Sequence, residues 1–312
     1  MYKKIWNKIK ESDNIVLISH INPDGDALGS SLSMYNILKN MNKKVIIVNM
    51  TEPAKYLDFL PNFDKVKKEL PKKIDLMISF DCGSFDRLGI ERRDYFLINL
   101  DHHISNTNYG DMNLIEPNAA STSQVVFNIL EANSIKIDKD SATCIYTALV
   151  TDTGNFQYES VTAEVFRVAS ELVKAGANPD FISKMLYQRD RLSRLRFLAK
   201  ALDTLELYLE GQVSVVEITK ELMDMTGAVK DDTEGLVNMI RAIESVEVAL
   251  LLREEDEGIK ISLRSKNYVD VSKIATKYGG GGHIRASGAT IKDKTFTEIK
   301  EMILADIKEQ LK

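Results

Sequence analysis

The sequence predicts an α/β protein in which a mostly parallel β-sheet domain is followed by a smaller α+β domain. Over the first half of the chain, short β-branched runs bounded by turn residues alternate with helical patterns, which is typical of a parallel sheet covered by helices. The pattern changes after Gly211, where strand-like runs become longer. The length of 312 residues also exceeds the size at which one hydrophobic core usually stops growing. We therefore expect two domains.

The first domain is predicted over residues 1–188. Its expected strands are Ile15–Ser19, Val45–Asn49, Leu76–Phe80 and Phe96–Leu100. The spacing of apolar residues predicts a helix over Ala27–Asn40, directly after the first strand. Further helices are expected from Ser121, from Lys139 and from Thr162.

The rest of the chain is predicted to form a helical linker over residues 189–210 and a second domain over residues 211–312. In the linker, one helical stripe collects the apolar residues Leu192, Leu195, Leu198, Ala199, Leu202 and Leu205. Beyond it, the runs VSVVEI, VEVALLLRE and IKISLRS predict strands. Helices are expected near Asp232–Ile240 and Thr295–Gln310, which makes this domain α+β.

Composition and charge exclude several classes of protein. A net charge of −5 and a pI near 5.6 argue against a protein that coats long duplex nucleic acid. The two cysteines, Cys82 and Cys144, provide neither a disulfide framework nor a cysteine-based zinc site. No apolar run is long enough for a signal peptide or a membrane span. We therefore expect a cytoplasmic protein without a membrane partner.

One histidine and two aspartates cluster where the first strand is expected to lead into the first helix. His20, Asp24 and Asp26 lie in I-S-H-I-N-P-D-G-D-A-L-G-S at positions 18–30. Ligands of open α/β sheets gather beyond the carboxyl ends of the strands, and this set of side chains suits a divalent cation. Gly25 would allow a turn tight enough for both carboxylates to converge. Alone, the segment also fits a surface turn with a helix cap at Asp26.

Other strand ends carry the same residue types. Asp81 follows the run L-M-I-S-F, and D-H-H at positions 101–103 follows F-L-I-N-L. Asp152 follows an apolar run and precedes a glycine, a position that alone would fit a turn or cap. The chain has four histidines, and three of them directly follow strands that would feed one sheet edge. This combination favours metal binding over isolated structural roles.

These segments, in this order, resemble the DHH phosphoesterase superfamily over nearly the whole chain. The resemblance rests on H-I-N-P-D-G-D-A-L-G-S, on Asp81 after a strand, on D-H-H at 101–103, on T-D-T-G-N-F at 151–156 and on G-G-G-G-H-I-R-A-S-G at 279–288. It implies a catalytic DHH domain with a Rossmann-like sheet, and a DHH-associated C-terminal domain that binds substrate.

The resemblance also implies a site with two divalent cations. One cation would be bound by His20, Asp24 and Asp81, and the other by Asp26, Asp81, His102 and Asp152, so that Asp81 bridges the two. Asp101 would orient the neighbouring histidines, as carboxylates commonly do for metal-bound imidazoles. His103 would face the substrate phosphate.

The expected chemistry follows from this set of ligands. Four clustered carboxylates would repel one another, whereas two divalent cations bring the charge close to neutral, so a metal-free protein should be less stable. A water shared by two cations about 3.5–4 Å apart can ionise near neutral pH and attack phosphorus, without a serine or cysteine nucleophile. Mixed imidazole and carboxylate ligands predict Mn²⁺, with Co²⁺, Fe²⁺ and Mg²⁺ as alternatives.

The second domain is expected to supply several of the residues that bind substrate. Gly281 and Gly282 would let the backbone approach a phosphate closely and point N–H groups at it, although a glycine run alone also fits a flexible loop. In the resemblance, His283 belongs to the same ligand-binding segment. The resemblance also implies that Arg264, at the end of a predicted strand, helps bind a terminal phosphate or nucleotide, for which a guanidinium is suited. A solvated surface arginine is the alternative for this residue.

Two residues of the first domain are expected to reach the same cleft, Arg87 and Asn106. Arg87 could instead pair with Asp86 or Glu91 on the surface. Cys82 should point away from the site and be buried and inert.

Within the superfamily, the chain resembles the branch of bacterial nano-RNases that also act on adenosine 3′,5′-bisphosphate (pAp), and this resemblance implies the same activity. The partners would then be short RNA or mono- and dinucleotides, and the family implies a homodimer. A cyclic di-AMP or linear dinucleotide phosphodiesterase would use the same metal site and is the alternative. A non-catalytic nucleotide sensor is disfavoured, because all six metal ligands are present.

Overall fold

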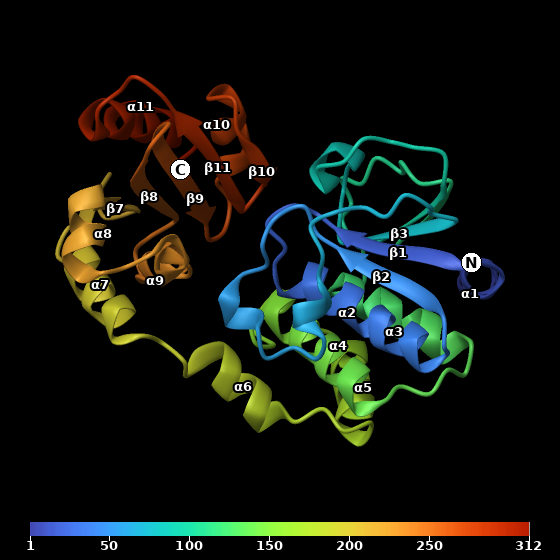
Figure 1. The fold of residues 1–312 in the computed structure, drawn as a ribbon. Helices are drawn as coiled ribbons and strands as arrows, with labels where there is room; N and C mark the ends of the chain where they lie inside the picture. The colour runs from blue at the N-terminus through green and yellow to red at the C-terminus, as the bar shows by residue number, and fades with distance from the viewer. Residues whose placement is uncertain (312) are drawn as a thin grey trace. The chain divides into compact units, whose positions relative to one another are not determined.

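The computed structural model describes residues 1–311, and the chain divides into two compact units. The first unit comprises Met1–Arg189 and the second begins at Asp190. Each unit has its own sheet with helices packed on it (Figure 1). The α/β fold class predicted from the sequence is confirmed.

A five-stranded parallel sheet, in the order β2-β1-β3-β4-β5, forms the centre of the first unit. The strands are β1 (Asn14–Ser19), β2 (Lys44–Val48), β3 (Leu76–Phe80), β4 (Phe96–Asp101) and β5 (Met112–Ile115). Because all strands run in one direction, their carboxyl ends meet at one edge. Strand β5 was not predicted, since its four residues M-N-L-I are too few and too mixed to give a strand pattern.

The helices of the first unit pack on one face of this sheet. They are α1 (Tyr2–Glu11), α2 (Gly25–Asn40), α3 (Thr122–Ala132), α4 (Lys139–Asp152), α5 (Ala163–Lys174) and α6 (Pro179–Tyr187). A single hydrophobic cluster joins all of them to alternate strand residues such as Ile15 and Leu17. Figure 1 shows α2 to α5 together on that side of the strands.

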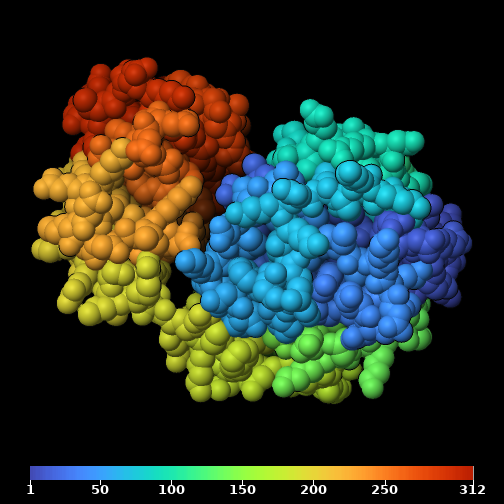
Figure 2. All heavy atoms as spheres, viewed as in Figure 1, coloured from blue at the N-terminus to red at the C-terminus, as the bar shows by residue number. Residues whose placement is uncertain are grey.

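Connecting segments cover the opposite face, so the sheet is not flanked by helices on both sides. Val16 and Ile18 alternate along β1 with Ile15 and Leu17 and therefore point to the opposite face. They pack on that face against Leu88 and Tyr95. These segments contain the short 3₁₀ helix η3 (Phe85–Leu88). Two further 3₁₀ helices, η1 (Lys55–Leu57) and η2 (Phe63–Lys65), pack on the helical face instead, where Leu57 and Phe63 contact the first cluster. In the space-filling view, the connecting segments around residues 50–90, in light blue to cyan, form much of the visible surface of the unit (Figure 2).

The second unit is built on a six-stranded mixed sheet in the order β10-β11-β9-β8-β7-β6. The strands are β6 (Glu206–Tyr208), β7 (Val213–Ile218), β8 (Val248–Glu255), β9 (Gly258–Ser265), β10 (Gly281–His283) and β11 (Ala286–Ile291). Helices α10 (Val271–Lys277) and α11 (Phe296–Lys308) cover one face. The other face carries α7 (Leu192–Leu202), α8 (Lys220–Thr226), the 3₁₀ helix η4 (Lys230–Thr233) and α9 (Leu236–Arg241).

Helix α7 falls in the segment predicted as a linker, but it packs within the second unit. Its buried residues are Phe197, Leu198 and Ala201, which join a cluster with strand β7. The predicted apolar stripe is wrong for four of its residues, which are exposed: Leu192, Leu195, Ala199 and Leu202. Phe197 and Ala201 are four residues apart and therefore lie on the same side of the helix. The buried face is on that side, and not on the side that the spacing of the leucines indicates.

Within residues 1–311, none of the helices combines the length and the apolar character that crossing a membrane requires.

Candidate active site

Helix α2 presents the first acidic residues because it begins directly beyond strand β1. Asp24 is the N-cap, and its Oδ1 accepts hydrogen bonds from the backbone N–H groups of Asp26 and Ala27, each at 3.0 Å. The cap is therefore Asp24, and the alternative that Asp26 caps the helix is wrong. Asp26 lies in the first turn and is 1% exposed, so its carboxylate points into the protein.

Glycine is required at position 25 for a different reason from the tight turn that the sequence indicates. Its φ is not positive, so no left-handed turn requires glycine there. A Cβ at Gly25 would lie 2.3 Å from Oγ1 of Thr151, and one at Gly29 would lie 2.6 Å from the carbonyl oxygen of Cys144. The two glycines thus allow α2 to pack closely on α4. This contact brings Asp152, the last residue of α4, to the same site as Asp26.

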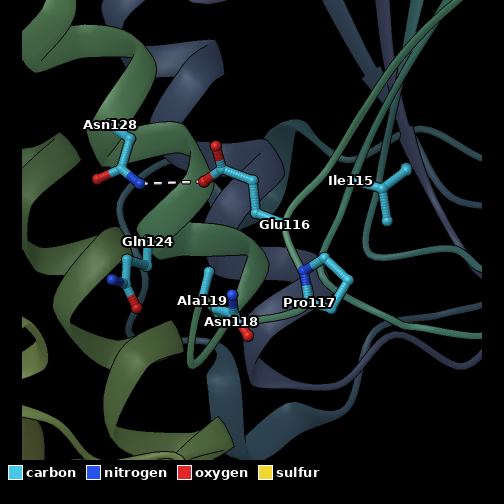
Figure 3. Close-up of a pocket in the computed structure, with 7 residues that line it drawn as sticks. All are labelled: Ile115, Glu116, Pro117, Asn118, Ala119, Gln124 and Asn128. Carbon is cyan, nitrogen blue, oxygen red and sulfur yellow. Dashed lines mark hydrogen bonds between the residues drawn. The ribbon is translucent and has the colours of Figure 1, made fainter.

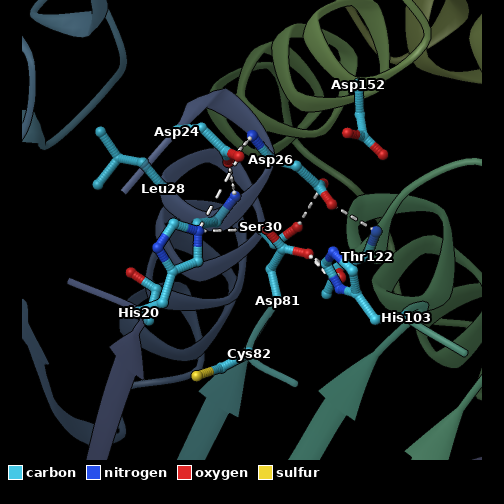
Figure 4. A network of polar contacts seen from close by, with 12 residues as sticks. His20, Asp24, Asp26, Leu28, Ser30, Asp81, Cys82, His103, Thr122 and Asp152 are labelled. Atoms are coloured by element: carbon cyan, nitrogen blue, oxygen red, sulfur yellow. Dashed lines mark hydrogen bonds and ion pairs between the residues drawn. The ribbon is translucent and has the colours of Figure 1, made fainter. Parts of the chain in front are cut away.

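Asp81 directly follows strand β3 and lies at the centre of the site (Figure 4). The residue is 2% exposed and has a φ of 54°, in the left-handed region that few non-glycine residues adopt. Its backbone N–H donates to the carbonyl of Leu100 at 3.0 Å. Backbone strain of this kind is often found at functional sites, and here it aims the carboxylate away from the strand axis.

The two oxygens of Asp81 face different groups of ligand-type side chains. Its Oδ2 lies 3.6 Å from Nε2 of His20, which is in turn 3.9 Å from Oδ2 of Asp24. Its Oδ1 lies 3.6 Å from Nε2 of His102. That same nitrogen is 3.3 Å from Oδ2 of Asp152 and 4.0 Å from Oδ2 of Asp26.

The donor atoms fall into groups that could each hold a metal ion, with all atoms of a group within 4.8 Å of one another. The groups are His20, Asp24 and Asp81; Asp26, His102 and Asp152; and Asp81, His102 and His103. Asp26 and Asp81 are buried, Asp152 is partly buried and Asp24 is exposed. Carboxylates together with imidazole nitrogens form a donor set that suits a borderline divalent cation. The residues therefore fit the cations that the fold implies.

The electrostatics of the site also favour a bound cation. Burial, and next the charge of Asp81, raise the pKa of both Asp26 and Asp152 well above its usual value. Burial alone would raise the pKa of Asp81 too, but the nearby imidazoles, His20 first, lower it below its usual range. Carboxylates held this close resist ionising together, and a cation between them removes that cost.

Asp101 anchors the two histidines that follow it. It is fully buried, and its Oδ1 accepts the backbone N–H of His102 at 2.8 Å and lies 2.7 Å from Nδ1 of His103. Burial lowers the pKa of His103, but the bond to Asp101 and the charge of Asp81 outweigh it and raise this pKa to about 9. The ring of His102 is held separately, because its Nδ1 lies 3.2 Å from the carbonyl oxygen of Ala119. That contact directs Nε2 of His102 into the site.

Asn106 lies beside Asp101, and its amide is fully engaged within the protein. The amide nitrogen donates to Asp101 Oδ2 and to the carbonyl of Cys82. The amide oxygen accepts from the side chain of Asn99 at 3.0 Å and from the backbone of Asn108 at 2.7 Å. An amide with two donor hydrogens and two lone pairs has no further capacity. This arrangement favours a role in holding Asp101 over direct contact with a substrate.

Arg87 lies in η3 and is exposed. Among the described residues, neither Asp86 nor Glu91 forms an ion pair with it. Cys82 is fully buried, as expected, and burial raises the pKa of its thiol to about 11. It is therefore a neutral thiol near neutral pH.

The second unit brings its own expected substrate residues together. Arg264 pairs with Ala286 across β9 and β11, and Ala286 pairs with His283 across β11 and β10. Residues opposite one another point to the same face, so Arg264 and His283 share a face two strands, or roughly 10 Å, apart. Both residues make further contacts within the protein.

The end of the glycine run forms a strand in an antiparallel hairpin, so the alternative of a flexible loop is wrong for these residues. Gly281–His283 form β10, paired with β11. Gly282 has a φ of 141°, and a Cβ there would lie 2.5 Å from the carbonyl oxygen of Ala286. Close packing of the hairpin therefore requires glycine at this position. A Cβ at Gly281 would meet nothing within 4 Å.

A cavity of about 410 Å³ lies between β5 and α3 (Figure 3). Its lining residues are Ile115, Glu116, Pro117, Asn118, Ala119, Gln124 and Asn128. The carboxylate of Glu116 already accepts hydrogen bonds from Tyr2 and, at 3.1 Å, from Asn128. The cavity has none of the ligand groups described above, so the candidate active site is the Asp81 cluster.

A parallel sheet with three overlapping groups of metal-ligand side chains at its carboxyl edge, followed by a mixed-sheet unit, defines the class. The chain belongs to the DHH family of phosphoesterases. The model of the DHH family, N-terminal domain, matches residues 14–149, and that of the DHHA1 domain matches residues 212–312.

Among curated relatives, the chain is 33% identical to the bifunctional oligoribonuclease and PAP phosphatase NrnA of Thermus thermophilus, covering 95% of this chain and 90% of that protein. It is 29% identical to the NrnA of Bacillus subtilis, covering 98% and 97%. A solved structure of an exopolyphosphatase-related protein from Bacteroides fragilis has a TM-score of 0.93 and 29% identity, covering 99% and 95%.

Proposed function

We propose that this chain is a two-metal phosphoesterase that hydrolyses short oligoribonucleotides and removes phosphate from pAp. The observation that carries the proposal is the division of the two Asp81 oxygens between His20 on one side and His102 on the other. The two NrnA relatives, matched over at least 90% of their length, support the choice of substrates.

The proposed ligands of the first cation are His20, Asp24 and Asp81. Those of the second are Asp26, Asp81, His102 and Asp152. When bound, the two cations supply an activated water as the nucleophile and stabilise the charge that develops on the phosphate. The ligand set favours Mn²⁺, with Co²⁺ or Mg²⁺ as alternatives.

His103 and Asp101 act on the substrate side. In the cation-free site, burial lowers the pKa of His103, but the bond to Asp101 and the charge of Asp81 outweigh it and raise this pKa to about 9. When protonated, the ring can donate a proton or a hydrogen bond from Nε2 to a phosphate oxygen. Asp101 holds the ring in place and favours its charged form. Arg87 is a further cation proposed to contact the substrate.

The second unit is proposed to bind part of the substrate. Arg264, His283 and the backbone around Gly281 and Gly282 would bind a terminal phosphate or nucleotide, because a guanidinium and backbone N–H groups suit phosphate oxygens. A cytoplasmic location and a homodimer stay predictions.

Comparing substrates tests the proposal. Purified protein with Mn²⁺ should hydrolyse pAp and a 5′-phosphorylated RNA dimer with higher kcat/KM than a longer RNA or cyclic di-AMP. A cyclic di-AMP phosphodiesterase, PdeA of Listeria monocytogenes, is 24% identical over 96% of this chain and 48% of that protein. A preference for cyclic di-AMP would therefore replace the proposed substrates, and no hydrolysis with metal bound would refute the activity.

Replacing Arg264 with Ala should raise KM for pAp by about 10–100-fold and leave kcat within a few fold, because a charge-assisted hydrogen bond contributes about 1.5–3 kcal/mol. Steady-state kinetics measure both constants. Lys273→Ala is the control, since Lys273 is a well-exposed cation of the same unit. An unchanged KM in the Arg264 variant would remove this residue from the site.

A further inference from the structure

Thr122 contacts two of the proposed metal ligands at once (Figure 4). Its backbone N–H donates to Oδ2 of Asp26 at 2.6 Å, and its hydroxyl donates to Oδ1 of Asp81 at 3.0 Å. The residue is fully buried. It therefore links a ligand on α2 to the ligand that follows β3.

The first turn of α3 holds Thr122 in place. Ser121 is the N-cap, and its hydroxyl accepts the N–H of Gln124 at 3.1 Å. The side chain of Gln124 in turn accepts the N–H of Ala120 at 2.8 Å. The N–H of Ser123 donates to Oδ1 of Asp26 at 2.9 Å, beside the bond from Thr122. Two backbone donors at a helix N-terminus thus fix the carboxylate of Asp26.

The hydroxyl of Thr122 selects one orientation of the Asp81 carboxylate. The torsion that rotates a carboxylate plane is broad and soft, and the backbone of Asp81 does not determine it. A hydrogen bond to Oδ1 favours the orientation in which Oδ1 lies 3.6 Å from His102 and Oδ2 lies 3.6 Å from His20. A carboxylate oxygen has two lone pairs, so Oδ1 can accept this bond and still bind a cation.

We propose that Thr122 is a positioning residue for the two-cation site, whose hydroxyl holds Asp81 so that one carboxylate oxygen faces His20 and the other faces His102. The inference rests on the proposed function, because it requires two cations. Loss of the hydroxyl leaves each group of ligands present but frees the shared carboxylate to turn toward one of them. The affinity for the second cation should then fall more than the affinity for the first.

Thr122→Val tests this directly, because valine keeps the shape of threonine without the hydroxyl. The first Mn²⁺ should bind with affinity near that of the wild type, and the second should bind about 10–100-fold more weakly, a typical loss for an outer-shell partner. Titration calorimetry measures both affinities. Electron paramagnetic resonance at two equivalents of Mn²⁺ should show loss of the spin-coupled pair.

Two matched variants separate this effect from a loss of stability. Thr122→Ser keeps the hydroxyl and should bind two Mn²⁺ ions as the wild type does. Thr147→Val removes the hydroxyl of another fully buried threonine, which donates to the carbonyl of Thr143 at 2.8 Å, and should leave Mn²⁺ binding unchanged. If Thr122→Val does not fold, Thr122→Ala takes its place in the same comparison.

Two results would overturn the role of Thr122. One is a Thr122→Val protein with two Mn²⁺ sites of wild-type affinity and an intact spin-coupled signal. The other is an equal loss of the second Mn²⁺ in Thr147→Val, which would assign the effect to general destabilisation. Neither measurement uses a substrate. A wild-type protein that binds two Mn²⁺ ions but does not hydrolyse pAp or RNA would therefore refute the proposed function. The Mn²⁺-binding test of Thr122 would still be valid in that case.

Discussion

Replacing Asp81 with Asn should lower kcat for pAp and for an RNA dimer by roughly 10³-fold or more. The amide has the shape of the carboxylate but no negative charge, so it cannot bridge two cations. Paired cations contribute several kcal/mol of transition-state stabilisation, and about 4 kcal/mol corresponds to this loss in rate. Steady-state kinetics with saturating Mn²⁺ measure the effect.

The control is Asp86→Asn, which removes an exposed carboxylate from the segment that follows Asp81. Its kcat should stay within about twofold of the wild type, because surface substitutions away from a site rarely matter. Circular dichroism checks that both variants are folded. An Asp81→Asn enzyme within tenfold of wild-type activity would refute the bridging role.

Removing the cations with a chelator should abolish turnover and lower the melting temperature of the first unit. A ligand present at about 100 times its Kd stabilises the folded state by about 2.7 kcal/mol per site. For a unit of this size, that corresponds to a shift of roughly 5–10 °C per site. Differential scanning calorimetry with and without Mn²⁺ measures the shift, and dialysis against Mn²⁺ should restore it.

The cation-free protein should also become less stable as the pH rises. Folding raises the pKa of Asp26 and Asp152, so the folded state binds more protons than the unfolded state and the free energy of unfolding falls as the pH rises above about 4. His103 acts in the same direction: the stability it contributes is complete below about pH 6.5 and is lost as the pH rises through about 9.

This pH dependence is checked by melting the chelated protein at about pH 5.5 and about pH 8.5. The melting temperature should be lower at the higher pH. The Asp152→Asn variant should show a smaller difference, because an amide does not titrate. With Mn²⁺ bound, the difference should shrink, since the cations favour the ionised carboxylates. A chelated protein that is more stable at the higher pH would contradict the electrostatic account of the site.

The strands and helices around the site were predictable because their patterns are local. Strand β3 has the bounds predicted for it, and the hydroxyl cap at Ser121 marks the start of α3. The apolar face of α7 and the pairing of the glycine run were not predictable, because both depend on partners distant in sequence. Strand β5 was not predictable for another reason, because its four residues M-N-L-I are too few and too mixed to give a strand pattern.

The sequence by itself determined the kinds of ligand and the sheet edge at which they gather, because acids and histidines that follow parallel strands must meet there. Only the tertiary structure decided how these ligand residues are distributed between the two sides of Asp81. The close packing of α2 on α4 at Gly25 and Gly29 brings Asp152 to Asp26, and Thr122 sets the plane of the Asp81 carboxylate. The order of residue types along the chain does not reveal these contacts, because they join segments as far apart as Gly25 and Thr151.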